Sequence, residues 1–213
     1  MRIAIGDVHG CYEALKCLLH DELKIQKSDE IYFVGDLISK GTNSLNVIEH
    51  IIDLTKKGYC VRSVLGNHEY RLLKSYYTDF RLFEAYLVHY NCTDILNGEL
   101  NILIEFISNF PFYISLEDWI IVHTQLGKEQ NYNQSDARFL FGDKNFKKLY
   151  MNGDIENKNQ VIGHTVRSLD NILMDCMMTS NIINVDGGCV YPDFGYLCGL
   201  NLDDFTLTYH KKK

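Results

Sequence analysis

The stretch Ile3-Ala4-Ile5-Gly6-Asp7-Val8-His9-Gly10 decides how the rest of this chain is interpreted. Its apolar residues predict a buried strand, and Gly6 permits a tight turn directly after that strand. Asp7 and His9 would then project from the carboxyl end of the strand, where open α/β sheets place their ligands. A single turn of this kind is common, so the pattern carries meaning only if it recurs along the chain.

The same arrangement does recur, because four later apolar runs also end in polar side chains. These are the runs Ile31 to Val34 before Asp36, Cys60 to Leu65 before Asn67 and His68, Trp119 to Val122 before His123, and Gln160 to Ile162 before His164. Helical spacing of apolar residues predicts one helix from about Cys11 to Lys24 and another over Leu45 to Ile52. The first third of the chain therefore predicts an α/β protein with a parallel sheet covered by helices.

The middle and the end of the chain carry weaker signals. Residues 69–110 predict a helical cover, and Ser135 to Phe141 predicts a short helix. From Ile182 onward the chain predicts antiparallel strands joined by turns at Gly187-Gly188 and Asp203-Asp204. A length of 213 residues suits one domain, which we place over residues 1–213.

Composition excludes several classes of function. A formal net charge of -7 argues against an extended nucleic-acid partner, which would require a basic face. No apolar run approaches the roughly 20 residues of a membrane span, and the chain begins directly in its first strand without a signal peptide. Seven scattered cysteines without a Cys-x-x-Cys pair indicate reduced thiols. We therefore expect a cytoplasmic protein that contacts neither membrane nor extended nucleic acid.

Side chains that follow the predicted strands could share one metal site. They are oxygen and imidazole donors, which suit two hard or borderline divalent cations, and no cysteine lies beside them. A carboxylate such as Asp36 can bridge two ions about 3.5–4 Å apart, which would generate a bridging hydroxide for in-line attack on phosphorus. The candidate ligands are Asp7, His9, Asp36, Asn67, His123 and His164.

His68 lies next to Asn67 and can take a different role. If Asn67 coordinates through its side-chain oxygen, His68 can face the leaving-group oxygen of the substrate and donate a proton as general acid. The spacing alone leaves the reverse assignment open, with His68 as a metal ligand.

These motifs together resemble the phosphoprotein phosphatase branch of the calcineurin-like metallophosphoesterases. The likeness is carried by Gly6-Asp7-Val8-His9-Gly10, Gly35-Asp36, Gly66-Asn67-His68-Glu69 and the two later histidines, in the family's order. The resemblance implies a metallophosphoesterase β-sandwich of two mixed sheets flanked by helices, in place of a single open sheet.

The resemblance also implies how two metal ions would be held. One ion would bind Asp7, His9 and Asp36, and His68 would act as the acid. The other ion would bind Asp36, Asn67, His123 and His164. Manganese is the metal that the resemblance favours, with iron or zinc as alternatives.

The second motif, from Gly35 to Thr42, departs from the family pattern. Ser39 stands where protein phosphatases carry the aspartate that orients the acid histidine, and Lys40 replaces a phosphate-binding arginine. Arg138 resembles the family's other phosphate-binding arginine, with a helix-surface arginine as the equal alternative. Symmetrical dinucleoside tetraphosphatases are similar proteins that also lack that aspartate.

The sequence thus predicts a dinuclear-metal phosphoesterase, in the first place a serine/threonine protein phosphatase. Its partners would be phosphorylated proteins or small phosphoesters. A symmetrical dinucleoside tetraphosphate hydrolase is the alternative enzyme. An alternative of another class, motivated by Ser39 and Lys40, is a module that binds phosphorylated partners with weak or no turnover.

Overall fold

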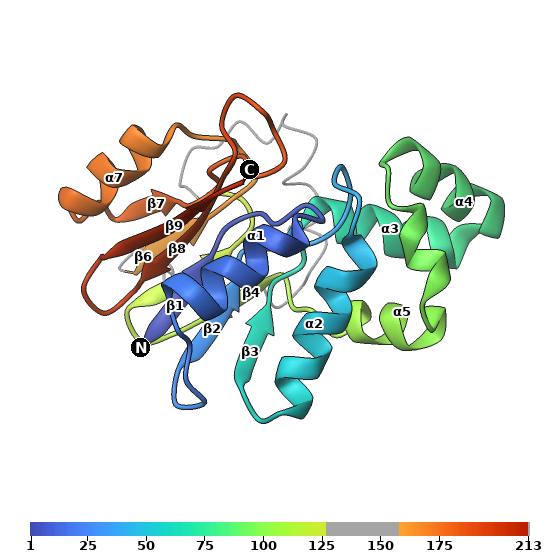
Figure 1. The fold of residues 1–213 in the computed structure, drawn as a ribbon, viewed down its shortest axis with the longest axis horizontal. Helices are drawn as coiled ribbons and strands as arrows, with labels where there is room; N and C mark the ends of the chain where they lie inside the picture. Colours follow the sequence, from blue (N-terminus) through green and yellow to red (C-terminus); the bar gives the residue numbers. More distant parts are fainter. Residues whose placement is uncertain (127–157, 213) are drawn as a thin grey trace.

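Two mixed β-sheets with helices around them make up the part of the chain that the computed structural model describes, residues 1–126 and 158–212 (Figure 1). The larger sheet has the strand order β3-β2-β1-β8-β9, and the smaller has the order β4-β5-β6-β7. The strands of the larger sheet are β1 Arg2–Ile5, β2 Glu30–Phe33, β3 Cys60–Ser63, β8 Tyr196–Asn201 and β9 Leu207–Lys211. Those of the smaller sheet are β4 Tyr113–Ser115, β5 Trp119–Val122, β6 Asn159–Ile162 and β7 Ile182–Asn184.

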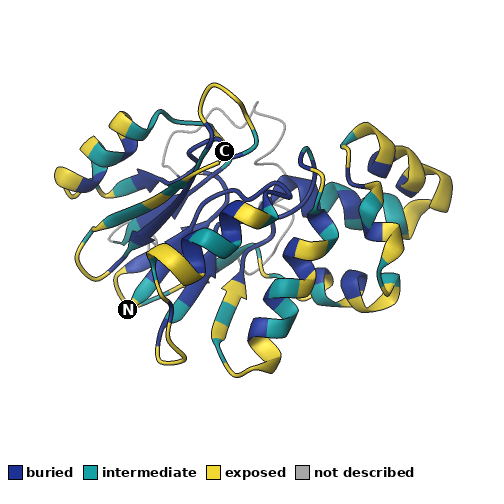
Figure 2. Ribbon diagram, in the orientation of Figure 1, coloured by how far each residue is buried: buried dark blue, intermediate teal, exposed yellow. Residues whose placement is uncertain are grey.

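Alternating side chains of the strands build two large apolar clusters and one small one among the described residues. On β1, Ile3 and Ile5 join the apolar cluster beneath the helices, whereas Ala4 joins the cluster between the sheets. The buried Trp119 of β5 belongs to that second cluster, and its indole N–H donates to the carbonyl of Leu202, 3.1 Å away. Both faces of each sheet are covered, and this explains why the strands carry apolar side chains on both sides. Figure 2 shows this burial concentrated in the strands.

The helices lie largely where the apolar spacing predicts them. Their bounds are α1 Tyr12–Lys16, α2 Ser44–Lys56, α3 Asn67–Thr78, α4 Phe80–His89, α5 Leu100–Ser108 and α7 Leu169–Met177. The single helix expected from Cys11 to Lys24 is instead α1 followed by a π-helical segment, η1, over Cys17–Glu22. A short 3₁₀ segment, η2, covers Thr93–Asn97. None of the described helices combines the length and the apolar character that a membrane span requires.

One expectation about the last third of the chain is wrong. Strand β7 pairs parallel with β6, in the register Val161 to Ile183, and α7 connects the two strands. Parallel neighbours need a crossover of this kind, and the sequence interpretation missed α7, which buries only Ile172 and Cys176. The antiparallel pairing of β8 with β9 is confirmed. The helix expected over Ser135 to Phe141 lies outside the described residues.

Candidate metal centre

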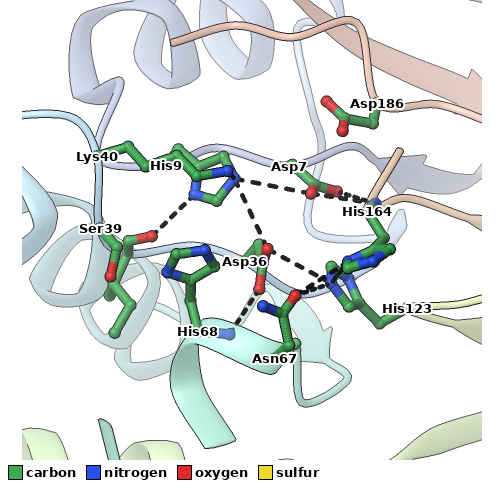
Figure 3. Close-up of polar contacts among 12 residues, drawn as sticks. Asp7, His9, Asp36, Ser39, Lys40, Asn67, His68, His123, His164 and Asp186 are labelled. Atoms are coloured by element: carbon green, nitrogen blue, oxygen red, sulfur yellow. Dashed lines mark hydrogen bonds and ion pairs between the residues drawn. The ribbon is translucent and has the colours of Figure 1, made fainter. Parts of the chain in front are cut away.

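The carboxyl ends of β1 and β2 in one sheet and of β5 and β6 in the other meet at one place (Figure 3). The structure brings together there all six side chains that the sequence proposes as ligands, together with His68. All of them are buried except His164, which is half-buried. The six are Asp7, His9, Asp36, Asn67, His123 and His164. Burial of this many polar groups is unfavourable unless they share protons or bind ions.

Asp36 lies at the middle of the cluster. Its Oδ2 atom is 3.6 Å from Nε2 of His9 and 3.4 Å from Nε2 of His123. The Oδ2 atom of Asp7 lies 3.9 Å from the same ring nitrogen of His9. Two groups of potential ligands result, one of His9, Asp36 and His68 and one of Asp36, His123 and His164. Asp36 belongs to both groups, as a carboxylate that bridges two ions must.

Backbone carbonyls fix the direction in which two of the imidazoles point. The Nδ1–H of His9 donates to the carbonyl of Ile38 at 3.0 Å, and the Nδ1–H of His123 donates to that of Val34 at 2.9 Å. The Nε2 atom of each ring is therefore directed into the carboxylate cluster. Imidazoles that ligate metals in proteins are commonly oriented in this way.

Asn67 and two histidines present a second convergence of donors. The Oδ1 atom of Asn67 lies 2.9 Å from Nε2 of His123 and 3.0 Å from Nδ1 of His164. The two ring nitrogens are themselves 3.2 Å apart. Lone pairs that meet so closely require a proton or a cation between them. This mixed nitrogen and oxygen set fits a borderline divalent ion such as manganese, iron or zinc.

The electrostatics of the cluster also favour a bound cation. Burial, and after it the neighbouring Asp186, raises the pKa of Asp7 well above its usual range. Burial likewise raises the pKa of Asp186 to about 6. Burial alone would lower the pKa of His123, but Asp36 and Asp7 outweigh it and raise that pKa to about 10. Without metal, a proton on His123 offsets part of the negative charge that divalent ions would neutralise.

Glu69 holds the loop that carries Asp36. Its Oε2 atom accepts hydrogen bonds from the backbone N–H groups of Asp36 and Gly66, at 2.9 and 3.1 Å. Its Oε1 atom accepts from those of Leu37 and Ile38, at 2.8 and 3.2 Å. Burial, and then Asp36, raises the pKa of Glu69 to about 7. The sequence interpretation assigned Glu69 no role, although a glutamate at the third helical position commonly reaches back to the N-cap amide.

Several site residues adopt a left-handed backbone conformation. The φ angles are +46° at His9, +51° at Asp36 and +71° at His164, and neighbouring Ser39 and Lys40 also have positive φ. This region is unfavourable for residues with a Cβ atom, and it clusters at functional sites in proteins.

The position of Ser39 shows what replaces the aspartate of protein phosphatases. Ser39 Oγ lies 2.9 Å from the hydroxyl of Tyr86, which donates to the carbonyl of His68 at 2.8 Å. The same hydroxyl is 3.4 Å from Nδ1 of His68. The sequence interpretation treated Tyr86 as a core residue, because its helical spacing is that of the apolar face of α4. The ring does lie in the core, and its hydroxyl in addition positions His68.

Lys40 lies beside the cluster and Arg138 cannot be placed. The ammonium of Lys40 is 2.8 Å from Nε2 of His9, and the Lys40 carbonyl accepts from the side-chain amide of Asn91 at 3.0 Å. Lys40 is thus the one of the two expected phosphate-binding residues that the structure brings to the site. Arg138 lies outside the described residues.

The backbone approaches the cluster closely at Gly163. The N–H of His164, the next residue, donates to the carboxylate of Asp7 at 3.1 Å. A Cβ atom on Gly163 would lie only 2.0 Å from the Oδ1 atom of Asp7. Glycine is required at this position because any side chain would displace that carboxylate.

Two packed mixed sheets whose strand ends gather carboxylates, imidazoles and an amide define the class of metal-dependent phosphoesterases. Residues 2–168 match the family of calcineurin-like phosphoesterases, and the chain belongs to that family. Members of the family use a dinuclear metal site. The fold expected from the resemblance, with two mixed sheets in place of one open sheet, is confirmed.

The similar curated proteins share a limited segment with this chain. The chain is 48% identical over 69 residues to the symmetrical bis(5'-nucleosyl)-tetraphosphatase of Citrobacter koseri, which is 32% of this chain and 23% of that enzyme. It is 43% identical over 72 residues to the enzyme of the same name from Erwinia tasmaniensis, covering 34% of this chain and 25% of that enzyme. The chain therefore matches only about a quarter of the length of these relatives.

Solved structures match over the whole chain at low sequence identity. A crystal structure provisionally assigned as a diadenosine tetraphosphatase has a TM-score of 0.67 and 19% identity, covering 100% of this chain and 93% of that one. A protein serine/threonine phosphatase from Saccharomyces cerevisiae has a TM-score of 0.59 and 15% identity, covering 100% and 79%. At these identities the likeness shows the shared fold alone.

Proposed function

We propose that this chain hydrolyses dinucleoside polyphosphates at a dinuclear metal site, as a symmetrical tetraphosphatase does. The observation that carries this proposal is the 48% identity over 69 residues with an enzyme of that name. The sequence analysis favoured a serine/threonine protein phosphatase and gave the tetraphosphatase as the alternative, and the similar curated proteins support the alternative better. Ser39, which is hydrogen-bonded to Tyr86, agrees with this revision, because it stands where protein phosphatases carry an aspartate that symmetrical tetraphosphatases also lack.

The ligand assignment belongs to the same proposal. Asp7, His9 and Asp36 would hold one divalent ion. Asp36, Asn67, His123 and His164 would hold the other. Two such ions would lower the pKa of a water molecule and neutralise charge on the phosphates. The support is the convergence of donor atoms on both sides of Asp36.

Lys40 and His68 would act on the substrate itself. A metal ion on Nε2 of His9 would displace the Lys40 ammonium from that lone pair, which would leave Lys40 to bind a substrate phosphate as a point charge. His68 would donate a proton to the leaving phosphate oxygen. Burial lowers the pKa of His68 to about 3, so the ring of the substrate-free protein is neutral near pH 7. The negative charge of a bound phosphoanhydride would favour the protonated ring.

The proposal is tested by parallel turnover of diadenosine tetraphosphate and a phosphoserine peptide, with manganese present. Central cleavage of diadenosine tetraphosphate yields two molecules of ADP, whereas asymmetric cleavage yields ATP and AMP. We expect ADP as the only nucleotide product and a higher kcat/KM for the dinucleotide. Faster turnover of the phosphopeptide would restore the protein phosphatase assignment. The absence of turnover for both would favour the binding module.

The role of His68 has its own test. We expect His68→Asn to retain both metal ions, measured by elemental analysis, while kcat falls by about 100-fold or more, since the proton donor is lost. Loss of one metal ion in this variant would instead make His68 a ligand, as its grouping with His9 and Asp36 allows.

A further inference from the structure

Two exposed aromatic rings, Tyr191 and Phe194, lie in the loop between β7 and β8 near the candidate metal centre. They are 38% and 37% exposed, whereas the ligands are buried or half-buried. The ammonium of Lys40 lies 5.2 Å from the ring centroid of Tyr191 and 2.8 Å from Nε2 of His9. The side chain of Lys40 therefore contacts both the exposed ring of Tyr191 and a proposed metal ligand.

The backbone of this loop is tied down. The carbonyl of Gly188 accepts from the N–H groups of Tyr191 and Gly195, at 2.9 and 3.1 Å. The N–H of Gly188 in turn donates to the Oδ1 atom of Asp186 at 2.9 Å, which anchors the loop beside the carboxylate cluster. The contact between Gly188 and Phe194 is close, because a Cβ atom on Gly188 would lie 2.8 Å from that of Phe194. The backbone that carries the aromatic residues is thus held in place before any ligand binds, which lowers the entropic cost of binding.

We propose that Tyr191, bordered by Phe194, is the stacking platform for a purine base of the substrate. This inference rests on the proposed function, because a dinucleoside polyphosphate carries an aromatic base at each end of its phosphate chain. The ring face that now meets the Lys40 ammonium is the face on which a base would stack. A phosphate of the substrate would draw that ammonium toward itself and free the ring. Lys40 would then lie between the phosphates at the metal centre and the base on Tyr191.

The test compares equilibrium binding of ADP and pyrophosphate, by calorimetry with manganese present. Both ligands present a diphosphate, but only ADP has a base. We expect Tyr191→Leu to weaken ADP binding by about 10-fold or more and to change pyrophosphate binding by less than about 2-fold, since base stacking on an aromatic ring is worth this much. Tyr191→Phe retains the ring and should keep the affinity for ADP. Tyr77→Leu is the matched control, because Tyr77 is an exposed tyrosine on α3.

Two results would overturn the proposal. Equal weakening of both ligands in Tyr191→Leu would mean that the ring only positions Lys40. Unchanged affinity for ADP in that variant would mean that no base stacks there. Failure of the proposed function is distinguishable from either result: it would appear as absent turnover of diadenosine tetraphosphate by the wild-type protein, while the comparison of ADP with pyrophosphate would still decide the role of Tyr191.

Discussion

The substitution Glu69→Gln should destabilise the protein and weaken metal binding together. The carboxylate of Glu69 accepts four backbone N–H groups, two on each oxygen. A glutamine amide can accept on its oxygen only, so its NH₂ group would face two buried donors that lose their acceptor. Each unsatisfied buried donor costs roughly 1–3 kcal/mol, so two of them should lower the free energy of unfolding by about 2–6 kcal/mol. For a chain of this length, that corresponds to a Tm lower by roughly 4–24 °C.

The assay is urea denaturation of the metal-free protein, followed by titration of the folded protein with manganese. The backbone of Asp36 is held by Glu69 at a φ of +51°, so release of the loop should also weaken the affinity for manganese. Glu49→Gln is the matched control, because Glu49 is exposed on α2. Stability and manganese affinity in Glu69→Gln equal to those of the control would refute the reasoning.

The remaining predictions concern the ligand cluster. Gly163→Ala should abolish manganese binding, because the added Cβ atom would lie 2.0 Å from the Oδ1 atom of Asp7. The far-UV circular dichroism of the variant should be retained. Normal manganese affinity in this variant would contradict the placement of Asp7. Manganese at about 100 times its dissociation constant should raise the free energy of unfolding of the wild-type protein by about 2.7 kcal/mol for each ion bound, and chelation should reverse this gain. The same addition should leave the Tm of Asp36→Asn nearly unchanged, and an undiminished shift would show that Asp36 does not bridge the ions.

The recurring pattern of apolar runs followed by polar residues predicted most of the site. Strand ends are local features, and Asp7, Asp36 and His123 each lie within three residues of the end of a strand. Convergence of Asp7 and Asp36 follows from topology, since the carboxyl ends of the parallel strands β1 and β2 share an edge, whereas His123 reaches them from the second sheet. The resemblance added the second sheet, which strand patterns alone could not separate from the first.

Features that depend on contacts between distant segments were not predictable from the sequence. Tyr86 has the spacing of a core residue, and only the position of Ser39 shows that its hydroxyl serves His68. Asp186 precedes the Gly187-Gly188 turn, and this sequence suggests only a loop. Nothing in it indicates that the carboxylate of Asp186 lies near that of Asp7. Helix α7 buries too few apolar residues to be told from a polar connection.

The left-handed backbone at His9, Asp36 and His164 would make the stability of the folded protein depend on the supply of metal ions. Such conformations cost of order 1–3 kcal/mol each, and three of them fall on proposed ligands. Metal binding would offset that strain, so the folded population would rise and fall with the supply of divalent ions. A cell short of those ions would then lose this chain to unfolding and proteolysis, and not merely to inactivity.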